Sequence, residues 1–215
     1  MGVKERKERE FKRREEDILV SAYDLLSQME PGQMTMEQIA EQAEIGRGTI
    51  YKHFKSKDEI YARLIFERRK KFIRRLEKIE VEGIERIPRL LRSYLEYCLE
   101  DKQAYAVHKK CDAHCVRDNI SPEMKQLLQK QQEKKVDIVK RILVKALGKE
   151  VMESDDLIYY TCAVWGMQRG AIDALLEDRF EGSVLDEARY FKIVEQTFLG
   201  GIPIIFSKNV SDKSV

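Results

Sequence analysis

The segment Thr35–Phe54 constrains the fold of this chain more than any other stretch of its sequence. It reads TMEQIAEQAEIGRGTIYKHF, and its apolar residues recur at a helical period in two short runs. The residues that share a face are Met36, Ile39, Ala40 and Ala43 in the first run and Ile50 and Phe54 in the second. A turn of three residues separates the runs, and Thr35 is placed to cap the first helix through its hydroxyl. The sequence therefore predicts two short helices packed against each other.

The outer surface of the second predicted helix has the chemistry of a surface that contacts DNA. At about 100° per residue, Gly48, Thr49 and Lys52 lie farthest from the apolar face, and Tyr51 and His53 lie on its flanks. Hydrogen-bond donors, a phenol and a glycine that permits close backbone approach suit the major groove. This layout is typical of a DNA-binding helix-turn-helix. An ordinary helical hairpin is the alternative interpretation.

Four blocks of the sequence, in order between residues 14 and 62, resemble the DNA-binding domain of TetR-family transcriptional regulators. They are Ile18/Ala22/Leu25/Leu26, Met36–Ala40, Gly48–Phe54 and Ser56–Glu59. The resemblance implies a dimer whose two heads each place residues 47–53 in a major groove of a near-palindromic operator. Two turn positions depart from the family pattern, with Glu44 in place of glycine and Gly46 in place of serine. We expect Glu44 to adopt a conformation that glycine takes without strain, and Gly46 to be a weaker helix cap.

The residues of the predicted DNA-binding surface fall into two groups. Arg47, Thr49 and Lys52 are placed for base edges, whereas Tyr51, His53 and Lys57 are placed for the phosphate backbone. The complete predicted set is Thr35, Arg47, Gly48, Thr49, Tyr51, Lys52, His53 and Lys57. The net charge of +2 does not identify a nucleic-acid partner by itself, because specific binding requires only a local basic face.

The rest of the chain is predicted to be helical, which makes the protein all-α. Hydrophobic residues form 43% of the chain and charged residues 36%, with four prolines and no strand-like alternation. An apolar stripe from Ile18 to Met29 predicts a first helix, and the charged segment before it favours a solvated helical extension over an arm in the minor groove. A fourth helix, capped by Ser56, is expected to run to Ile79. The remaining predicted helices cover residues 84–100, 102–117, 122–147, 154–178 and 184–206.

This pattern predicts about nine helices in two domains. Residues 1–60 form a three-helix DNA-binding head with a helix-turn-helix, and residues 61–215 form a larger ligand-binding and dimerisation domain. No run approaches 18 apolar residues, so no membrane partner is expected. The amino terminus lacks an apolar signal core, and the four cysteines form no C-x-x-C pair. We therefore expect a cytoplasmic protein with reduced thiols.

The cluster His108, Cys111 and Cys115 is the one site-like group outside the head. These residues share a helical stripe and could line a pocket, sense oxidants or bind zinc. Packing or pocket lining is favoured, because cysteine packs as a small hydrophobe on a face that must point inward. Catalytic motifs, cofactor motifs and metal-binding motifs are not found in the sequence, so no enzyme, cofactor or metal is predicted. The candidate ligand-binding residues are Tyr94, Tyr97, Tyr105, His108, Cys111, Trp165, Gln168 and Arg169.

The last two predicted helices are rich in apolar and small residues. Gly166 and Gly170 lie four apart and form a shallow groove for another helix, either within the chain or from a second copy. The resemblance implies the second copy, with residues 155–205 forming the homodimer interface. The predicted function is a repressor released from its operator by a small hydrophobic effector, for which a fatty-acid-like or acyl-CoA-like molecule is a candidate. The alternatives are a helical-bundle enzyme or metal-binding protein that uses His108, Cys111 and Cys115, and a structural adaptor without an operator.

Overall fold

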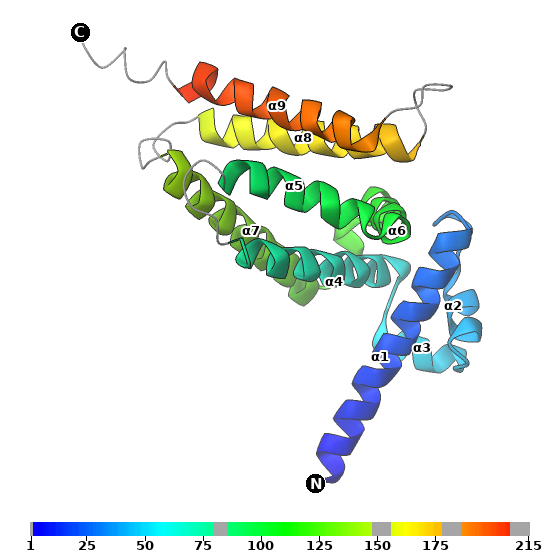
Figure 1. The fold of residues 1–215 in the computed structure, drawn as a ribbon. Helices are drawn as coiled ribbons and strands as arrows, with labels where there is room; N and C mark the ends of the chain where they lie inside the picture. The colour runs from blue at the N-terminus through cyan, green and yellow to red at the C-terminus, as the bar shows by residue number, and fades with distance from the viewer. Residues whose placement is uncertain (1, 80–85, 148–155, 178–185, 207–215) are drawn as a thin grey trace. The chain divides into compact units, whose positions relative to one another are not determined.

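The protein folds entirely into helices in the part of the chain that the structure describes. A computed structural model describes residues 2–79, 86–147, 156–177 and 186–206 (Figure 1). It contains nine α-helices and a short 3-10 helix, η2 (Arg117–Asn119), with no strand over these ranges. The α-helices are α1 (Val3–Gln28), α2 (Met36–Gln42), α3 (Arg47–His53), α4 (Lys57–Glu77), α5 (Arg86–Leu99), α6 (Lys102–His114), α7 (Pro122–Leu147), α8 (Asp156–Leu176) and α9 (Glu187–Phe206). The predicted all-α class and helix number are confirmed.

These helices pack as two compact units. Unit 1 comprises Met1–Lys71 and Gln103–Gln132, and unit 2 comprises Phe72–Lys102 and Glu133–Val215. The helices α4 and α7 each contribute residues to both units. The expected boundary between functional domains at residue 60 stays a prediction, because compact packing does not by itself assign a function to each part.

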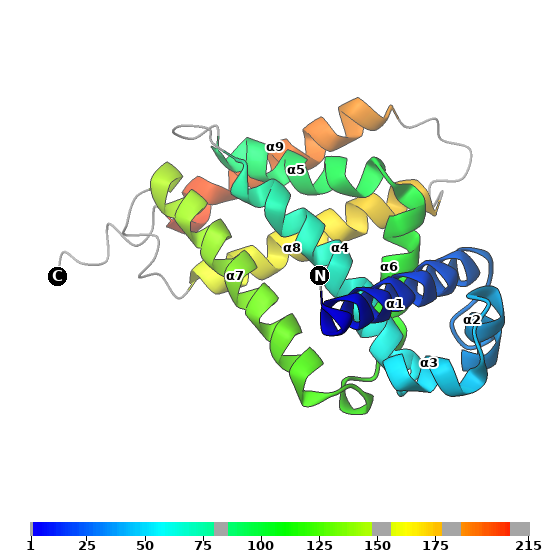
Figure 2. The same cartoon turned by 90° about the horizontal axis from the view of Figure 1, so that it is seen from below.

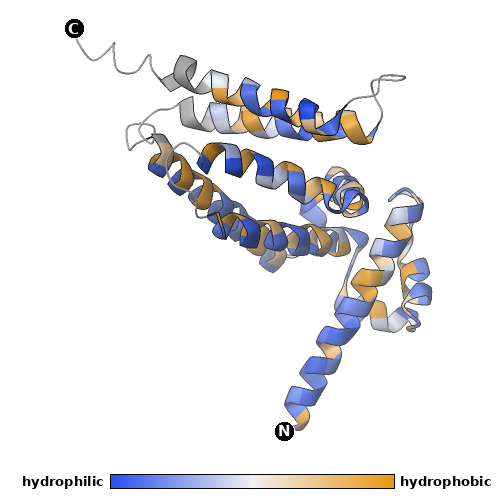
Figure 3. Ribbon diagram, in the orientation of Figure 1, coloured by the Kyte–Doolittle hydropathy of each residue, from blue (hydrophilic) through white to orange (hydrophobic). Residues whose placement is uncertain are grey.

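The first helix is longer than its apolar stripe. It begins at Val3, so the charged segment forms the predicted helical extension, with an ion pair of 3.1 Å between Lys12 and Glu8 one turn apart. The extension is hydrophilic in Figure 3. Only the second half of α1 has a buried face, which includes Ile18, Ala22 and Leu26. This half provides the surface on which α2 packs, and α3 packs in turn against α2 (Figure 2).

The helix-turn-helix has the predicted caps and turn. The Thr35 hydroxyl accepts the N–H of Gln38 at 3.1 Å, and the Gln38 side chain accepts the N–H of Thr35 at 2.8 Å, which forms a capping box. Glu44 has a φ of 53°, the left-handed conformation expected where the family has glycine. Gly46 caps α3 without a side-chain hydrogen bond. Ile50 is fully buried and holds α3 in the core of unit 1.

The helix α6 belongs to the same unit as the helix-turn-helix, which the sequence does not indicate. The Lys110 ammonium donates to the carbonyls of Leu26 at 3.2 Å and Met29 at 3.0 Å, so it satisfies the carboxyl end of α1. The Asp58 carboxylate accepts the N–H of Val116 at 2.7 Å. This bond uses a donor that would otherwise continue the helix. The α6 helix therefore ends at His114. Its periodicity predicts an end at residue 117, so that boundary is wrong by three residues.

Unit 2 contains two apolar clusters built from α5, α8 and α9 and from parts of α4 and α7. In the first, the Tyr160 hydroxyl donates to the carbonyl of Phe198 at 3.0 Å and ties α8 to α9. The second surrounds Phe72 and Leu76 and includes Trp165. Across the described residues, none of the helices is long and apolar enough to cross a membrane.

Candidate nucleic-acid interface and internal pocket

The outer face of α3 is open, as predicted. Arg47, Gly48, Tyr51 and Lys52 are exposed, and Thr49 is partly buried. A Cβ atom added to Gly48 would meet no atom within 4 Å, so the backbone at this position can approach another molecule closely. This face combines two cations, a hydroxyl and a phenol, which are donors that match base edges and phosphates.

The capping position at Thr35 and the first residue of α3 lie beside this face. Thr35 is exposed, and its hydroxyl oxygen accepts a backbone N–H while its own proton remains available for a phosphate. The guanidinium of Arg47 lies 3.5 Å from a carboxylate oxygen of Glu37, which comes from the first turn of α2. The sequence interpretation does not include Glu37, since an acidic residue beside DNA runs against the simple expectation of a basic surface.

Two of the predicted phosphate-contacting residues have partners inside the protein. The His53 ring packs against the ring of Phe11, and burial lowers the pKa of His53 below the ordinary value. The Lys57 ammonium donates to the carbonyls of Pro31 at 3.2 Å and Met34 at 2.7 Å, which fixes the α1–α2 loop. Two of the three N–H donors of the Lys57 ammonium are thus used inside the protein, and a contact with a DNA phosphate would use the third. The assignment of His53 and Lys57 to DNA binding stays a prediction.

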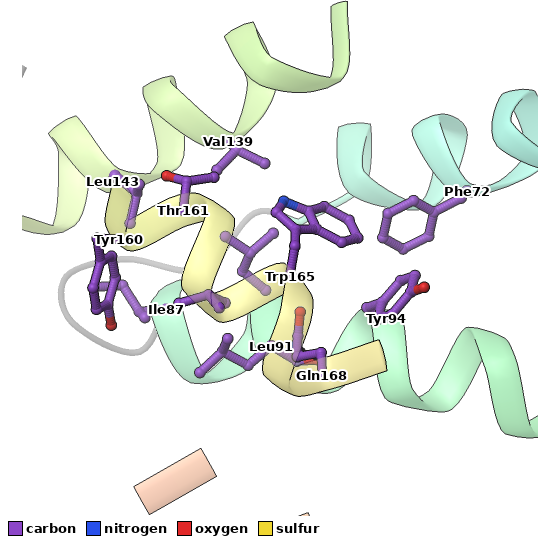
Figure 4. A pocket seen from close by; sticks show the side chains of 12 residues that line it. Phe72, Ile87, Leu91, Tyr94, Val139, Leu143, Tyr160, Thr161, Trp165 and Gln168 are labelled. Atoms are coloured by element: carbon purple, nitrogen blue, oxygen red, sulfur yellow. Dashed lines mark hydrogen bonds between the residues drawn. The ribbon is translucent and has the colours of Figure 1, made fainter. Parts of the chain in front are cut away.

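An apolar pocket lies within unit 2 (Figure 4). Its cavity volume is about 40 Å³. None of its twelve lining residues is charged. They are Phe72 from α4, Ile87, Leu90, Leu91 and Tyr94 from α5, Val139 and Leu143 from α7, and Tyr160, Thr161, Val164, Trp165 and Gln168 from α8.

Aromatic rings close one end of this pocket, and a buried amide sits beside them. The ring centroids of Tyr94 and Trp165 lie 4.9 Å apart, and those of Phe72 and Tyr94 lie 5.3 Å apart, both edge to face. Figure 4 shows these three side chains pointing toward one another. The Gln168 side chain is 3% exposed and donates to the carbonyl of Leu91 at 3.0 Å. The pocket therefore suits an apolar molecule with at most a small polar group.

The structure brings together only part of the predicted ligand-binding set. Tyr94, Trp165 and Gln168 line the pocket, whereas Tyr97 packs against Phe72 and is not among the lining residues. Tyr105, His108 and Cys111 lie in unit 1, and Arg169 is exposed. These five residues lie outside this pocket, and their role in ligand binding stays a prediction. The aliphatic lining of α5 and α7 was missed because its spacing is that of any buried helix face.

The His108 cluster packs against the core of unit 1. Cys111 is fully buried, and burial raises the pKa of its thiol to about 12. Burial likewise raises the pKa of the Cys115 thiol and lowers that of His108 to about 4. A zinc site requires deprotonated thiols, which this apolar setting disfavours. No group of three potential metal-ligating side chains occurs in the described ranges. These observations favour packing over a metal site or a reactive thiol.

Comparisons with known proteins agree with this geometry. Residues 18–64 match the family described as bacterial regulatory proteins, tetR family, and no curated protein matches the chain. A solved structure described as that of a regulatory protein, SCO4313, has a TM-score of 0.67 at 15% identity, over 90% of this chain and 98% of that one. The transcriptional regulator FadR from Bacillus subtilis, in complex with stearoyl-CoA, has a TM-score of 0.63 at 20% identity, over 86% and 97%.

A TetR transcriptional regulator from Rhodococcus sp. RHA1 has a TM-score of 0.53 at 12% identity, over 85% of this chain and 93% of that one. At such identities the similarity establishes the fold alone. The matched segment contains the whole helix-turn-helix, with its capping box and the exposed face of α3. Residues 18–64 therefore form an amino-terminal DNA-binding domain of the tetR family of bacterial regulatory proteins.

Proposed function

We propose that this transcriptional regulator is a repressor that binds a near-palindromic operator as a homodimer and leaves it when a hydrophobic molecule binds. The exposed face of α3 within the matched segment is the observation that carries the proposal. One helix-turn-helix reads only a few base pairs, so useful specificity requires two heads on two half-sites. DNA bound in this way can block transcription from a promoter that overlaps it.

The surface of α8 and α9 supports a dimer. Tyr159 and Met167 of α8 and Ile193 of α9 are 72%, 46% and 52% exposed, so both helices present large apolar side chains that a second copy of the chain would cover. A Cβ atom added to Gly166 or Gly170 would meet no atom within 4 Å. No intramolecular neighbour in the described ranges therefore accounts for these glycines. Of the proposed interface, residues 155–205, the structure describes 156–177 and 186–205.

The pocket of unit 2 supports a hydrophobic effector. None of its lining residues is charged, and the Lys135 ammonium lies 4.5 Å from the centroid of the Trp165 ring. A carboxylate buried among the apolar lining residues would be costly, so we expect any charged group of the effector to remain outside the pocket. FadR, whose fold is similar to that of this protein, has a solved structure in complex with stearoyl-CoA. We therefore propose an acyl chain as the buried part of the effector. A cavity of about 40 Å³ holds few atoms, so the surrounding side chains would have to separate around a long chain.

Footprinting on the promoter region of the protein's own gene tests the DNA-binding part of the proposal. We expect one protected, two-fold-symmetric site, and at least a thousandfold preference for it over scrambled DNA at about 150 mM salt. Equal binding of the two DNAs would contradict the proposal.

Release of the operator tests the effector part. Long-chain acyl-CoA should dissociate the complex, whereas CoA alone, which lacks the apolar chain, should not. A Trp165→Ala protein provides the matched comparison, because it changes the pocket and leaves the helix-turn-helix intact. It should bind the operator normally and respond to acyl-CoA at a different concentration. Release by CoA alone, or an unchanged response of the variant, would contradict the proposed pocket.

A further inference from the structure

An acidic side chain stands beside the predicted DNA-contacting face, next to its first cation. Glu37 lies in the first turn of α2, and its carboxylate is 3.5 Å from the Arg47 guanidinium. The two side chains are 41% and 75% exposed. A carboxylate in this place repels DNA phosphates and so weakens binding to every sequence. Because Glu37 lowers the affinity of the protein for all DNA, its presence beside Arg47 indicates a role other than tight binding.

Stability of the free protein does not supply that role. An exposed ion pair of this kind contributes about 0–1 kcal/mol, since water and salt screen it. The pair links α2 to α3, but Ile39 and Ile50 already hold the two helices together through the core. The electrostatic interaction becomes stronger when DNA covers it and removes water.

The position of Arg47 provides a second argument. It is the first residue of α3, where the helix dipole is positive and a cation is unfavourable. The first turn of α3 contains no acidic residue, so the carboxylate of Glu37 reaches Arg47 from the neighbouring helix. A guanidinium has five donors in one plane, so one edge can bind a carboxylate while the other donates to a base.

We propose that Glu37 is a positioning residue that holds the Arg47 guanidinium in the plane needed to donate to O6 and N7 of a guanine. The proposal rests on the proposed function and adds a determinant of its sequence specificity. A free arginine at the same place would swing to nearby phosphates, which carry no sequence information. Glu37 thus exchanges some overall affinity for discrimination at one base pair.

Binding of the wild-type operator and of operators changed at single base pairs tests the proposal. The variants are Glu37→Gln, Arg47→Ala and the double variant, with Glu41→Gln as the control. Glu41 is an exposed carboxylate on the same helix, so its replacement removes the same charge without touching Arg47. Melting temperatures report whether α2 remains folded in each variant.

We expect Glu37→Gln to lose about tenfold discrimination at the one base pair that Arg47→Ala also affects, while affinity for non-operator DNA rises or stays constant. In the Arg47→Ala background the same change should not alter discrimination further. Glu41→Gln should preserve discrimination at every position.

Unchanged discrimination in Glu37→Gln would overturn the proposal. So would a loss of equal size with and without Arg47, since Glu37 would then act independently of it. A wild-type protein that binds all sequences equally would overturn the proposed function itself, and the inference with it.

Discussion

The ring of Phe11, in the charged half of α1, lies 4.0 Å from the imidazole ring of His53 at the end of α3. The two planes are inclined by 31°, and Nδ1 of His53 is buried without a hydrogen-bond partner in the described part of the protein. Burial is also the main reason that the pKa of His53 is lowered. His53 therefore ties α3 to the extension of α1, in addition to any contact it makes with DNA.

Replacement of Phe11 by alanine should weaken this connection. An aromatic pair contributes about 0.5–1.5 kcal/mol, so we expect the free energy of unfolding in urea to fall by about 1 kcal/mol. Val20→Ala is the matched control, because Val20 is an apolar residue of α1 that is 60% exposed. Its replacement should have little effect. Equal losses in the two variants would show that the ring contact contributes nothing specific.

Lysine variants separate the base contacts from the structural contacts of the head. Lys57→Ala removes two hydrogen bonds to carbonyls, so stability should fall by about 1–3 kcal/mol, and the salt dependence of DNA binding should weaken by about one unit of slope. Lys52→Ala, on the exposed face of α3, should leave stability unchanged and lose about 1–3 kcal/mol of discrimination at one base pair. Melting curves and binding at several salt concentrations distinguish the two. Identical behaviour would contradict the division of roles.

The head was predictable from sequence because its structure depends on local signals. The capping box at Thr35 and the buried Ile50 each follow from residues a few positions apart, and the positive φ of Glu44 is expected because the family that the head resembles has glycine there. The capping of α1 by Lys110 was not predictable, since the two lie more than 80 residues apart and lysine on a helix is ordinarily a solvated residue. The internal partners of Lys57 and His53 were missed for the same reason.

Glu44 provides a test of strain in the turn. Its φ of 53° costs a residue with a Cβ atom about 1 kcal/mol, and glycine avoids this cost. We therefore expect Glu44→Gly to raise the melting temperature of the protein, in spite of the greater flexibility of glycine in the unfolded chain. Glu41→Gly, within α2, should lower it, because glycine is unfavourable inside a helix. The same direction of change in both variants would contradict this explanation.

His108 should make stability depend on pH. Burial lowers its pKa in the folded protein from 6.5 to about 4, with Arg68 and Arg69 lowering it further and Asp112 opposing them. Between these values the unfolded chain binds the proton more readily, so the free energy of unfolding should be highest above pH 6.5 and fall as the pH drops toward 4. The full loss is about 3 kcal/mol.

Urea unfolding of wild-type protein and His108→Gln across this range measures the contribution. The variant should lose less stability than the wild type as the pH falls. His114→Gln is the control, because His114 lies on the same helix and is exposed. A wild-type pH profile that His108→Gln leaves unchanged would show that this histidine is not buried in its neutral form.

The pocket was predicted less completely than the head. The sequence indicates Trp165 and Gln168 as pocket residues, because aromatic and amide side chains are unusual on an apolar helix. It does not indicate Leu91 and Val139, which are aliphatic residues like those of any buried helix face. Whether an aliphatic side chain lines a cavity or fills the core depends on how four helices meet, which no single segment determines.

The final prediction concerns the surface of α8. Gly170 is exposed with open space around its Cα atom, and the exposed Met167 and Gly166 lie within one turn of it. Glutamate at position 170 should fit the isolated chain, because nothing in the described residues occupies that space. At the centre of a tightly packed dimer interface, the same side chain would bury a charge without a partner. Gly170→Glu should therefore be folded but monomeric by analytical ultracentrifugation, with operator affinity reduced at least a hundredfold, since one head contacts one half-site. Lys192→Glu, at an exposed position of α9, places a carboxylate elsewhere on the same pair of helices and helps to locate the interface.

A Gly170→Glu protein that remains dimeric and binds the operator normally would place the interface away from α8.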